Sequence, residues 1–210
     1  MNPGEFVPLF ESNGFILELD FYCMEQVYKM LRARLDAGQK AVRVSINQSR
    51  MHFGQKNYIA RLNALREKYQ IPNELIELEL TESIFADMQD ISRGVEELKA
   101  NGYHLSVDDF GSGYSSLNMI KEIPIDTLKI DRDFLSDDEQ ESGRYQKVIR
   151  KVVELAKELN MSIICEGVEK EEQADFLQSV GCMYAQGFLY AKPMPEQDFL
   201  DLLEEKPDDK

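Results

Sequence analysis

The chain alternates short apolar segments with longer segments of helical periodicity, and this alternation constrains its fold more than any other feature. Residues 21–37 are typical of the helices, because Met24, Val27, Leu31 and Leu35 recur on one stripe. We expect strands at 41–47, 75–80, 104–108, 127–130, 162–165 and 184–187. We expect helices at 21–37, 58–69, 91–100, 116–121, 144–159, 171–180 and 196–203. Because a helix separates each strand from the next, the strands should be parallel.

Two α/β architectures fit this order, an open doubly wound sheet and a barrel of the TIM type. The chain contains no GxGxxG or Walker motif, which an open sheet usually carries after its first strand. Polar residues do follow the carboxyl ends of the expected strands: Asn47, Glu79, Asp108 with Asp109, Lys129 with Asp131, Glu166 and Gln186. Each alone has an ordinary structural explanation, but a barrel brings all these ends to one mouth. We therefore predict a TIM-type barrel with about six parallel strands present.

Adjacent carboxylates at Asp108 and Asp109 indicate the chemistry of that mouth. They follow the β-branched Val107 and precede a loop with two glycines, Gly111 and Gly113. Neighbouring carboxylates repel each other unless a cation lies between them, and oxygen ligands suit Mg²⁺, Mn²⁺ or Ca²⁺. Two such ions about 3.5–4 Å apart form a site for phosphodiester hydrolysis. Lys129 is placed to orient the water or to neutralise developing charge.

Length and composition limit the other possibilities. The 210 residues suit one domain, expected at 1–203, followed by a flexible acidic tail at 204–210. A net charge of −15 argues against a nucleic acid polymer as partner. No apolar stretch has the length of a membrane helix, and we expect no membrane segment. Three cysteines without CxxC spacing indicate a reducing compartment, so the expected location is cytoplasmic.

The chain resembles the EAL-domain family of cyclic di-GMP phosphodiesterases over essentially its whole length. Residues 45–49, 76–83, 108–117, 128–131, 166–169, 173, 181–182 and 186–188 carry the resemblance. Gln48 stands where an apolar residue is usual in the family. The resemblance implies hydrolysis of cyclic di-GMP to pGpG in bacterial signal transduction, with two ions of Mg²⁺ or Mn²⁺.

The resemblance also assigns the metal ligands. It implies that Asn47, Glu79 and Asp108 bind one metal ion. Asp109 would bind the second ion, with Asp108 bridging the two. Glu166 would lie in the same metal cluster.

Further roles follow from the resemblance for residues around this cluster. Lys129 would hold the attacking water, and Gln186 would lie near it. Glu169 would lie near the site or the substrate. Glu82 would anchor the loop after Asp109, the loop that in this family couples dimerisation to activity.

One departure from the family pattern is large, because the sequence Glu-Ala-Leu occurs nowhere in this chain. In the family that glutamate is a metal ligand on an earlier strand, so we expect an N-terminally incomplete barrel lacking roughly two strands. We expect this shortened chain to hydrolyse cyclic di-GMP very slowly or not at all. We also expect a homodimer or other self-association, through the open edge at 41–47 or the loop after Asp109. The alternative is a non-catalytic module that binds cyclic di-GMP or a protein.

Overall fold

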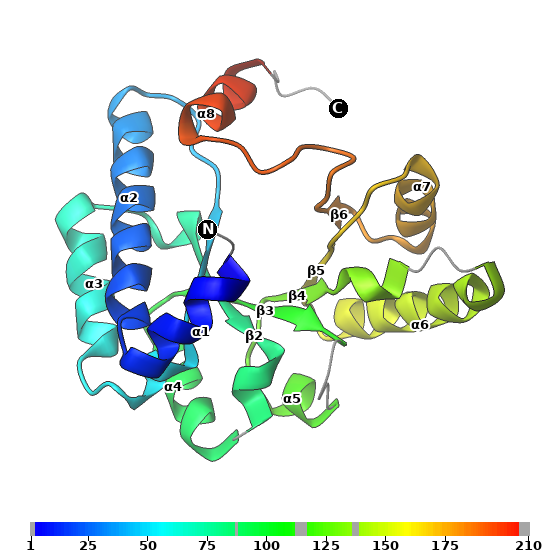
Figure 1. The fold of residues 1–210 in the computed structure, drawn as a ribbon, viewed down its shortest axis with the longest axis horizontal. Helices are drawn as coiled ribbons and strands as arrows, with labels where there is room; N and C mark the ends of the chain where they lie inside the picture. Colours follow the sequence, from blue (N-terminus) through cyan, green and yellow to red (C-terminus); the bar gives the residue numbers. More distant parts are fainter. Residues whose placement is uncertain (1–2, 87, 112–116, 136–138, 206–210) are drawn as a thin grey trace.

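Six parallel strands pair side by side in chain order and form a curled, incomplete barrel of the TIM type, as expected (Figure 1). They are β1 (Val44–Asn47), β2 (Ile76–Thr81), β3 (His104–Phe110), β4 (Thr127–Ile130), β5 (Ser162–Cys165) and β6 (Tyr184–Ala185). The computed structural model describes residues 3–86, 88–111, 117–135 and 139–205. Within these residues, β1 and β6 are the two edges of the sheet.

Helices precede every strand and follow the last one. They are α1 (Pro3–Asn13), α2 (Ile16–Asp36), α3 (Tyr58–Tyr69), α4 (Met88–Ala100), α5 (Leu117–Glu122), α6 (Glu139–Glu158), α7 (Glu171–Val180) and α8 (Glu196–Glu205). Short 3-10 helices, η1 (Arg50–Gly54), η2 (Asn73–Leu75), η3 (Glu82–Ala86) and η4 (Arg132–Leu135), lie in the connections. No helix in the described part of the chain is long and apolar enough to cross a membrane.

Side chains alternate along β2, and this alternation separates the core from the site. Ile76, Leu78 and Leu80 are each 0% exposed and belong to the core shared with α2, α3 and α4. Glu77 and Glu79 lie between them and so point to the other face of the sheet, the inside of the curl. A second core cluster joins β4 and β5 to α6 and α7. The apolar face of the sheet therefore fixes the strands, while the inner face carries polar side chains.

At both ends of the chain, the helices differ from the sequence-based expectation. No helix was assigned to residues 3–13 from the sequence; helix α1 forms there with Pro3 at its first position, where proline fits. Helix α8 continues through Glu205, beyond the expected boundary at 203. Glu204 therefore belongs to a helix, and its carboxylate accepts a hydrogen bond from Arg34 at 3.0 Å. The rest of the expected tail, 206–210, lies outside the described residues.

Candidate metal centre at the strand ends

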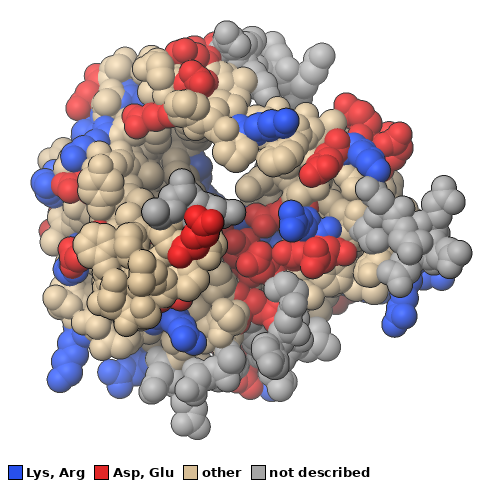
Figure 2. Space-filling view, in the orientation of Figure 1, with Lys and Arg blue, Asp and Glu red and all other residues tan. Residues whose placement is uncertain are grey.

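The carboxyl ends of β1 to β5 bring five of the expected residues to the same end of the sheet. Asn47 ends β1 and lies opposite Glu79 of β2 in the ladder. Asp108 of β3 lies opposite Thr81, which is two residues beyond Glu79 along β2. Lys129 lies in β4, and Glu166 directly follows β5. Figure 2 shows acidic side chains gathered near the centre of the face in view.

Lys129 contacts three carboxylates in this group. Its ammonium nitrogen lies 2.6 Å from Glu166 Oε1, 2.8 Å from Glu79 Oε1 and 3.2 Å from Asp108 Oδ1. The side chain of Lys129 is 5% exposed, and that of Glu79 is 7% exposed. One buried positive charge therefore faces three carboxyl groups, and the cluster retains an excess of negative charge.

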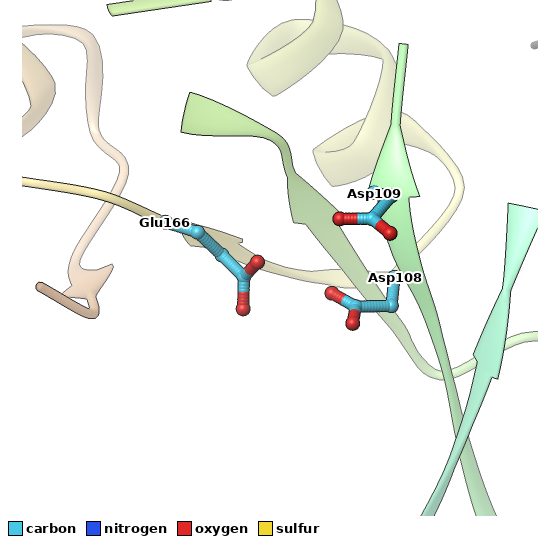
Figure 3. A group of neighbouring side chains, drawn as sticks. All are labelled: Asp108, Asp109 and Glu166. Atoms are coloured by element: carbon cyan, nitrogen blue, oxygen red, sulfur yellow. The ribbon is translucent and has the colours of Figure 1, made fainter. Parts of the chain in front are cut away.

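A local irregularity in β3 turns both neighbouring aspartates toward the same side. The pairing of β3 with β4 shifts register between Val107 and Phe110, and Asp109 has a left-handed backbone with φ +56°. Carboxylate oxygens of Asp108, Asp109 and Glu166 consequently lie within 4.8 Å of one another (Figure 3). In a regular strand, successive side chains would point to opposite faces.

Three of the four carboxyl groups hold their protons more tightly than free carboxylic acids. Burial raises the pKa of Glu79 to about 7. Burial and the neighbouring charge of Asp108 raise the pKa of Asp109 to about 6. Burial also raises the pKa of Glu166. Burial acts to raise the pKa of Asp108 as well, but the hydrogen bond with Glu79 and the charge of Lys129 outweigh it and lower that pKa. Burial acts to lower the pKa of Lys129, but Glu79 and Glu166 outweigh it and raise that pKa, so Lys129 stays charged.

The donors present fit a hard divalent cation. All of them are carboxylate or amide oxygens, which suit Mg²⁺ or Mn²⁺, and the described part of the cluster contains neither histidine nor cysteine. Lys129 contacts three of these carboxyl groups and Asp109 adds a fourth, so the cluster lacks a positive charge for each carboxylate. A divalent ion would supply that charge.

Glu82 lies beside the cluster and holds the start of the loop after β3. It is 4% exposed, and its Oε2 accepts a hydrogen bond from the Gly111 backbone N–H at 2.9 Å. Gly111 has φ +98°, and a side chain there would overlap the ring of Phe134. The sequence-based expectation also concerned residues 112–116 of this loop, which lie outside the described residues.

Other expected residues surround the mouth without joining the buried cluster. The side chains of Asn47, Gln186 and Glu169 are exposed. Gln186 lies next to β5, because its backbone N–H donates to the Cys165 carbonyl at 2.8 Å. Glu169 belongs to the connection between β5 and α7, and its N–H donates to Gln173 Oε1 at 2.9 Å.

Two features of the site were not expected from the sequence. Asp131, which follows Lys129 by two residues, interacts with Asp109 and helps raise the pKa of Asp109. Its position near a strand end was a visible signal, although no role was assigned to it. Gln48 and Tyr58 form a buried hydrogen bond of 2.8 Å behind β1, and no local sequence pattern pairs these two residues.

The fold and the site define a TIM-type barrel protein with an acidic centre at the carboxyl ends of its strands. The EAL domain family matches residues 1–193, and the chain belongs to that family. The bifunctional diguanylate cyclase/cyclic di-GMP phosphodiesterase MucR of Pseudomonas aeruginosa is 37% identical over 202 residues, which are 95% of this chain and 29% of MucR. The cyclic di-GMP phosphodiesterase RocR of the same organism is 34% identical over 201 residues, 95% of this chain and 50% of RocR.

Solved structures agree with this membership. The PaMucR phosphodiesterase, in a c-di-GMP complex, superimposes with a TM-score of 0.86 at 33% identity, covering 95% of this chain and 81% of that one. The chain spans between 25% and 29% of the length of the signaling protein YkoW, MucR and the phosphodiesterase NbdA. Family and fold are thus shown for the chain itself.

Proposed function

We propose that this chain is a metal-dependent phosphodiesterase domain that hydrolyses cyclic di-GMP to pGpG in bacterial second-messenger signalling. The observation that carries the proposal is the convergence of Asp108, Asp109 and Glu166, whose oxygens lie within 4.8 Å. The names of MucR and RocR as cyclic di-GMP phosphodiesterases support the choice of substrate. The expectation that this chain turns over cyclic di-GMP very slowly or not at all remains part of the proposal.

We assign the cluster to two ions of Mg²⁺ or Mn²⁺. Asn47, Glu79 and Asp108 would hold one ion, and Asp109 the other, with Asp108 shared. Glu166 completes the acidic group and lies close to both aspartates. Such ions would supply activated water and charge stabilisation during in-line displacement at phosphorus.

Lys129 is the residue that the geometry best suits to orient the attacking water. Its raised pKa keeps it as an ammonium, so it donates hydrogen bonds and does not act as a base. Its contacts with Glu79 and Glu166 fix the position of the ammonium group. The same charge would stabilise the negative charge that develops on the phosphate oxygens.

The remaining assignments concern the surroundings of the site. We assign Gln186 and Glu169 to positions near the substrate, and Glu82 to the anchoring of the loop after Asp109. The free thiols Cys23, Cys165 and Cys182 suit the reducing cytoplasm. Self-association through the β1 edge or through the loop after Asp109 also belongs to the proposal.

Calorimetric titration tests the site before any turnover is measured. Mn²⁺ should bind the purified chain, and cyclic di-GMP should bind the Mn²⁺-loaded chain; Asp109→Asn should weaken both. Asp133→Asn is a matched control, because the Asp133 side chain is 79% exposed. Failure of Mn²⁺ to bind would contradict the proposal. Cyclic di-GMP binding of equal strength with and without Mn²⁺ would instead favour a non-catalytic binding module.

A further inference from the structure

Gln48 is a buried polar residue that uses both ends of its side-chain amide next to the end of β1. It is 4% exposed, and its Nε2 donates a hydrogen bond to the Asn47 carbonyl at 2.7 Å. Its Oε1 accepts a hydrogen bond from the Tyr58 hydroxyl at 2.8 Å. Its backbone N–H donates to the Glu79 carbonyl of β2 at 2.9 Å. The peptide between Asn47 and Gln48 is therefore held at its carbonyl and at its N–H.

Tyr58 is itself held in one position, so it can act as a fixed donor. It is 4% exposed, and its ring stacks on the ring of His52 with centroids 4.6 Å apart and planes 21° apart. His52 Nε2 lies 2.9 Å from Asp20 Oδ2, and the same oxygen accepts the Ser49 N–H at 2.9 Å. Asp20 of α2 and Tyr58 of α3 therefore hold adjacent residues after β1 from the helix side of the sheet.

The side chain of Asn47 points to the opposite face of β1 from the side chain of Gln48. Side chains alternate along β1, so buried Ile46 and Gln48 face the helices while Ser45 and Asn47 face the inside of the curl. Ser45 confirms this direction, because its hydroxyl donates to Glu77 Oε1 at 3.1 Å. A peptide plane held at both ends restricts the backbone of Asn47, and hence the direction in which its side chain leaves the strand.

We propose that Gln48 and Tyr58 are positioning residues that fix the carboxyl end of β1 and aim the Asn47 amide at the metal centre. This inference rests on the proposed function for the role of Asn47, but the restraint on β1 is independent of it. Residues that orient metal ligands from behind commonly change metal affinity 10–100-fold when they are replaced. The hydrogen bonds of Gln48 to Asn47 and Glu79 end on backbone carbonyls, so the pair acts on the metal centre through the backbone.

The test uses a double variant, Gln48→Leu with Tyr58→Phe, in the otherwise intact chain. Gln48→Leu alone would leave the Tyr58 hydroxyl buried without its acceptor, whereas the double variant removes both polar ends at similar volume. We expect the double variant to keep its melting temperature within a few degrees and to bind Mn²⁺ about tenfold more weakly or worse, by calorimetry. In the metal-free protein, amide hydrogen exchange at 47–49 should become faster.

Tyr28→Phe is the matched control. Tyr28 is 0% exposed on α2, and its hydroxyl has no hydrogen-bond partner among the described residues. This variant should change neither Mn²⁺ affinity nor exchange at 47–49. Equal Mn²⁺ affinity of the double variant and the parent chain would overturn the proposal, as would an equal loss in Tyr28→Phe.

Hydrogen exchange separates this inference from the proposed function. If the parent chain binds no Mn²⁺, the assignment of the metal centre fails, and the exchange data alone decide the role of the pair. Faster exchange confined to 47–49 in the double variant would then support the restraint on β1. Unchanged exchange there would overturn it.

Discussion

Lys129 and Glu166 form the shortest ion pair of the acidic centre, with 2.6 Å between the ammonium nitrogen and Glu166 Oε1. The same nitrogen also contacts Glu79 and Asp108, at 2.8 Å and 3.2 Å. Side chains from β2, β3, β4 and the end of β5 thus meet at one buried positive charge. Lys129 therefore contributes both to the stability of the metal-free barrel and to the proposed chemistry.

Replacing Lys129 should separate these two contributions. Lys129→Met leaves buried carboxylates without their cation and should lower the free energy of unfolding of the metal-free chain by about 3 kcal/mol. Saturating Mn²⁺ should restore part of that loss while hydrolysis stays absent. Denaturant titration with and without Mn²⁺ measures the effect. Lys121→Met serves as control, since Lys121 is 75% exposed; equal stability of the two variants would contradict the role of Lys129.

The raised pKa of Glu79 predicts how the stability of the metal-free chain depends on pH. Burial raises this pKa from 4.5 to about 7, so the folded chain binds the proton more tightly than the unfolded chain. The resulting stabilisation is complete below pH 4.5 and is lost as the pH rises through about 7.

Between about pH 5 and about pH 8, we expect Glu79 to account for a loss of roughly 1–3 kcal/mol. Glu79→Gln should flatten this slope, and saturating Mn²⁺ should reverse it, because the metal binds the deprotonated form. Denaturant titration across this pH range gives the slopes. An identical slope in the parent chain and Glu79→Gln would rule out this origin.

The surroundings of Gly111 predict that any side chain at this position, at the start of the loop after β3, lowers the free energy of unfolding. Gly111→Ala places a methyl group against Phe134 at φ +98°, whereas Gly14→Ala meets nothing within 4 Å at φ +79°. Both variants carry backbone strain, so their difference isolates the overlap with Phe134. We expect Gly111→Ala to be about 2 kcal/mol less stable than Gly14→Ala by denaturant titration. Equal stability of the two would show that Phe134 moves freely.

Because β1 lies at an edge of the sheet, we expect the chain to self-associate through it. Within the described residues β1 pairs only with β2, so its outer edge has no strand partner and could pair with a strand of another chain. Light scattering over a dilution series should show dimers or larger species at micromolar concentration. Val42→Lys, next to this edge, should shift the equilibrium toward monomer, while Val148→Lys on α6 should not. A chain that is monomeric at all concentrations would rule out self-association through the β1 edge.

Periodicity was sufficient to predict much of the fold, because buried strands and amphipathic helices differ in period. The strands at 127–130 and 162–165 have the expected bounds, whereas β3 continues two residues further, to Phe110. That extension includes the irregularity at Asp109, which depends on pairing with β4 and leaves no local signature. The positions of Asp108 and Glu166 at strand ends were predictable. Their separation and the network behind Asn47 depend on tertiary packing.

Formation of pGpG by the purified chain tests the central claim most directly. Cyclic di-GMP should be incubated with an excess of the chain, with Mn²⁺ or with a chelator, and the nucleotides separated by chromatography. The account predicts that pGpG forms very slowly or not at all, and that any pGpG formed requires Mn²⁺, disappears in Asp109→Asn and persists in Asp133→Asn. Ready turnover by the parent chain, or turnover that is equal with chelator or equal in Asp109→Asn, would contradict it.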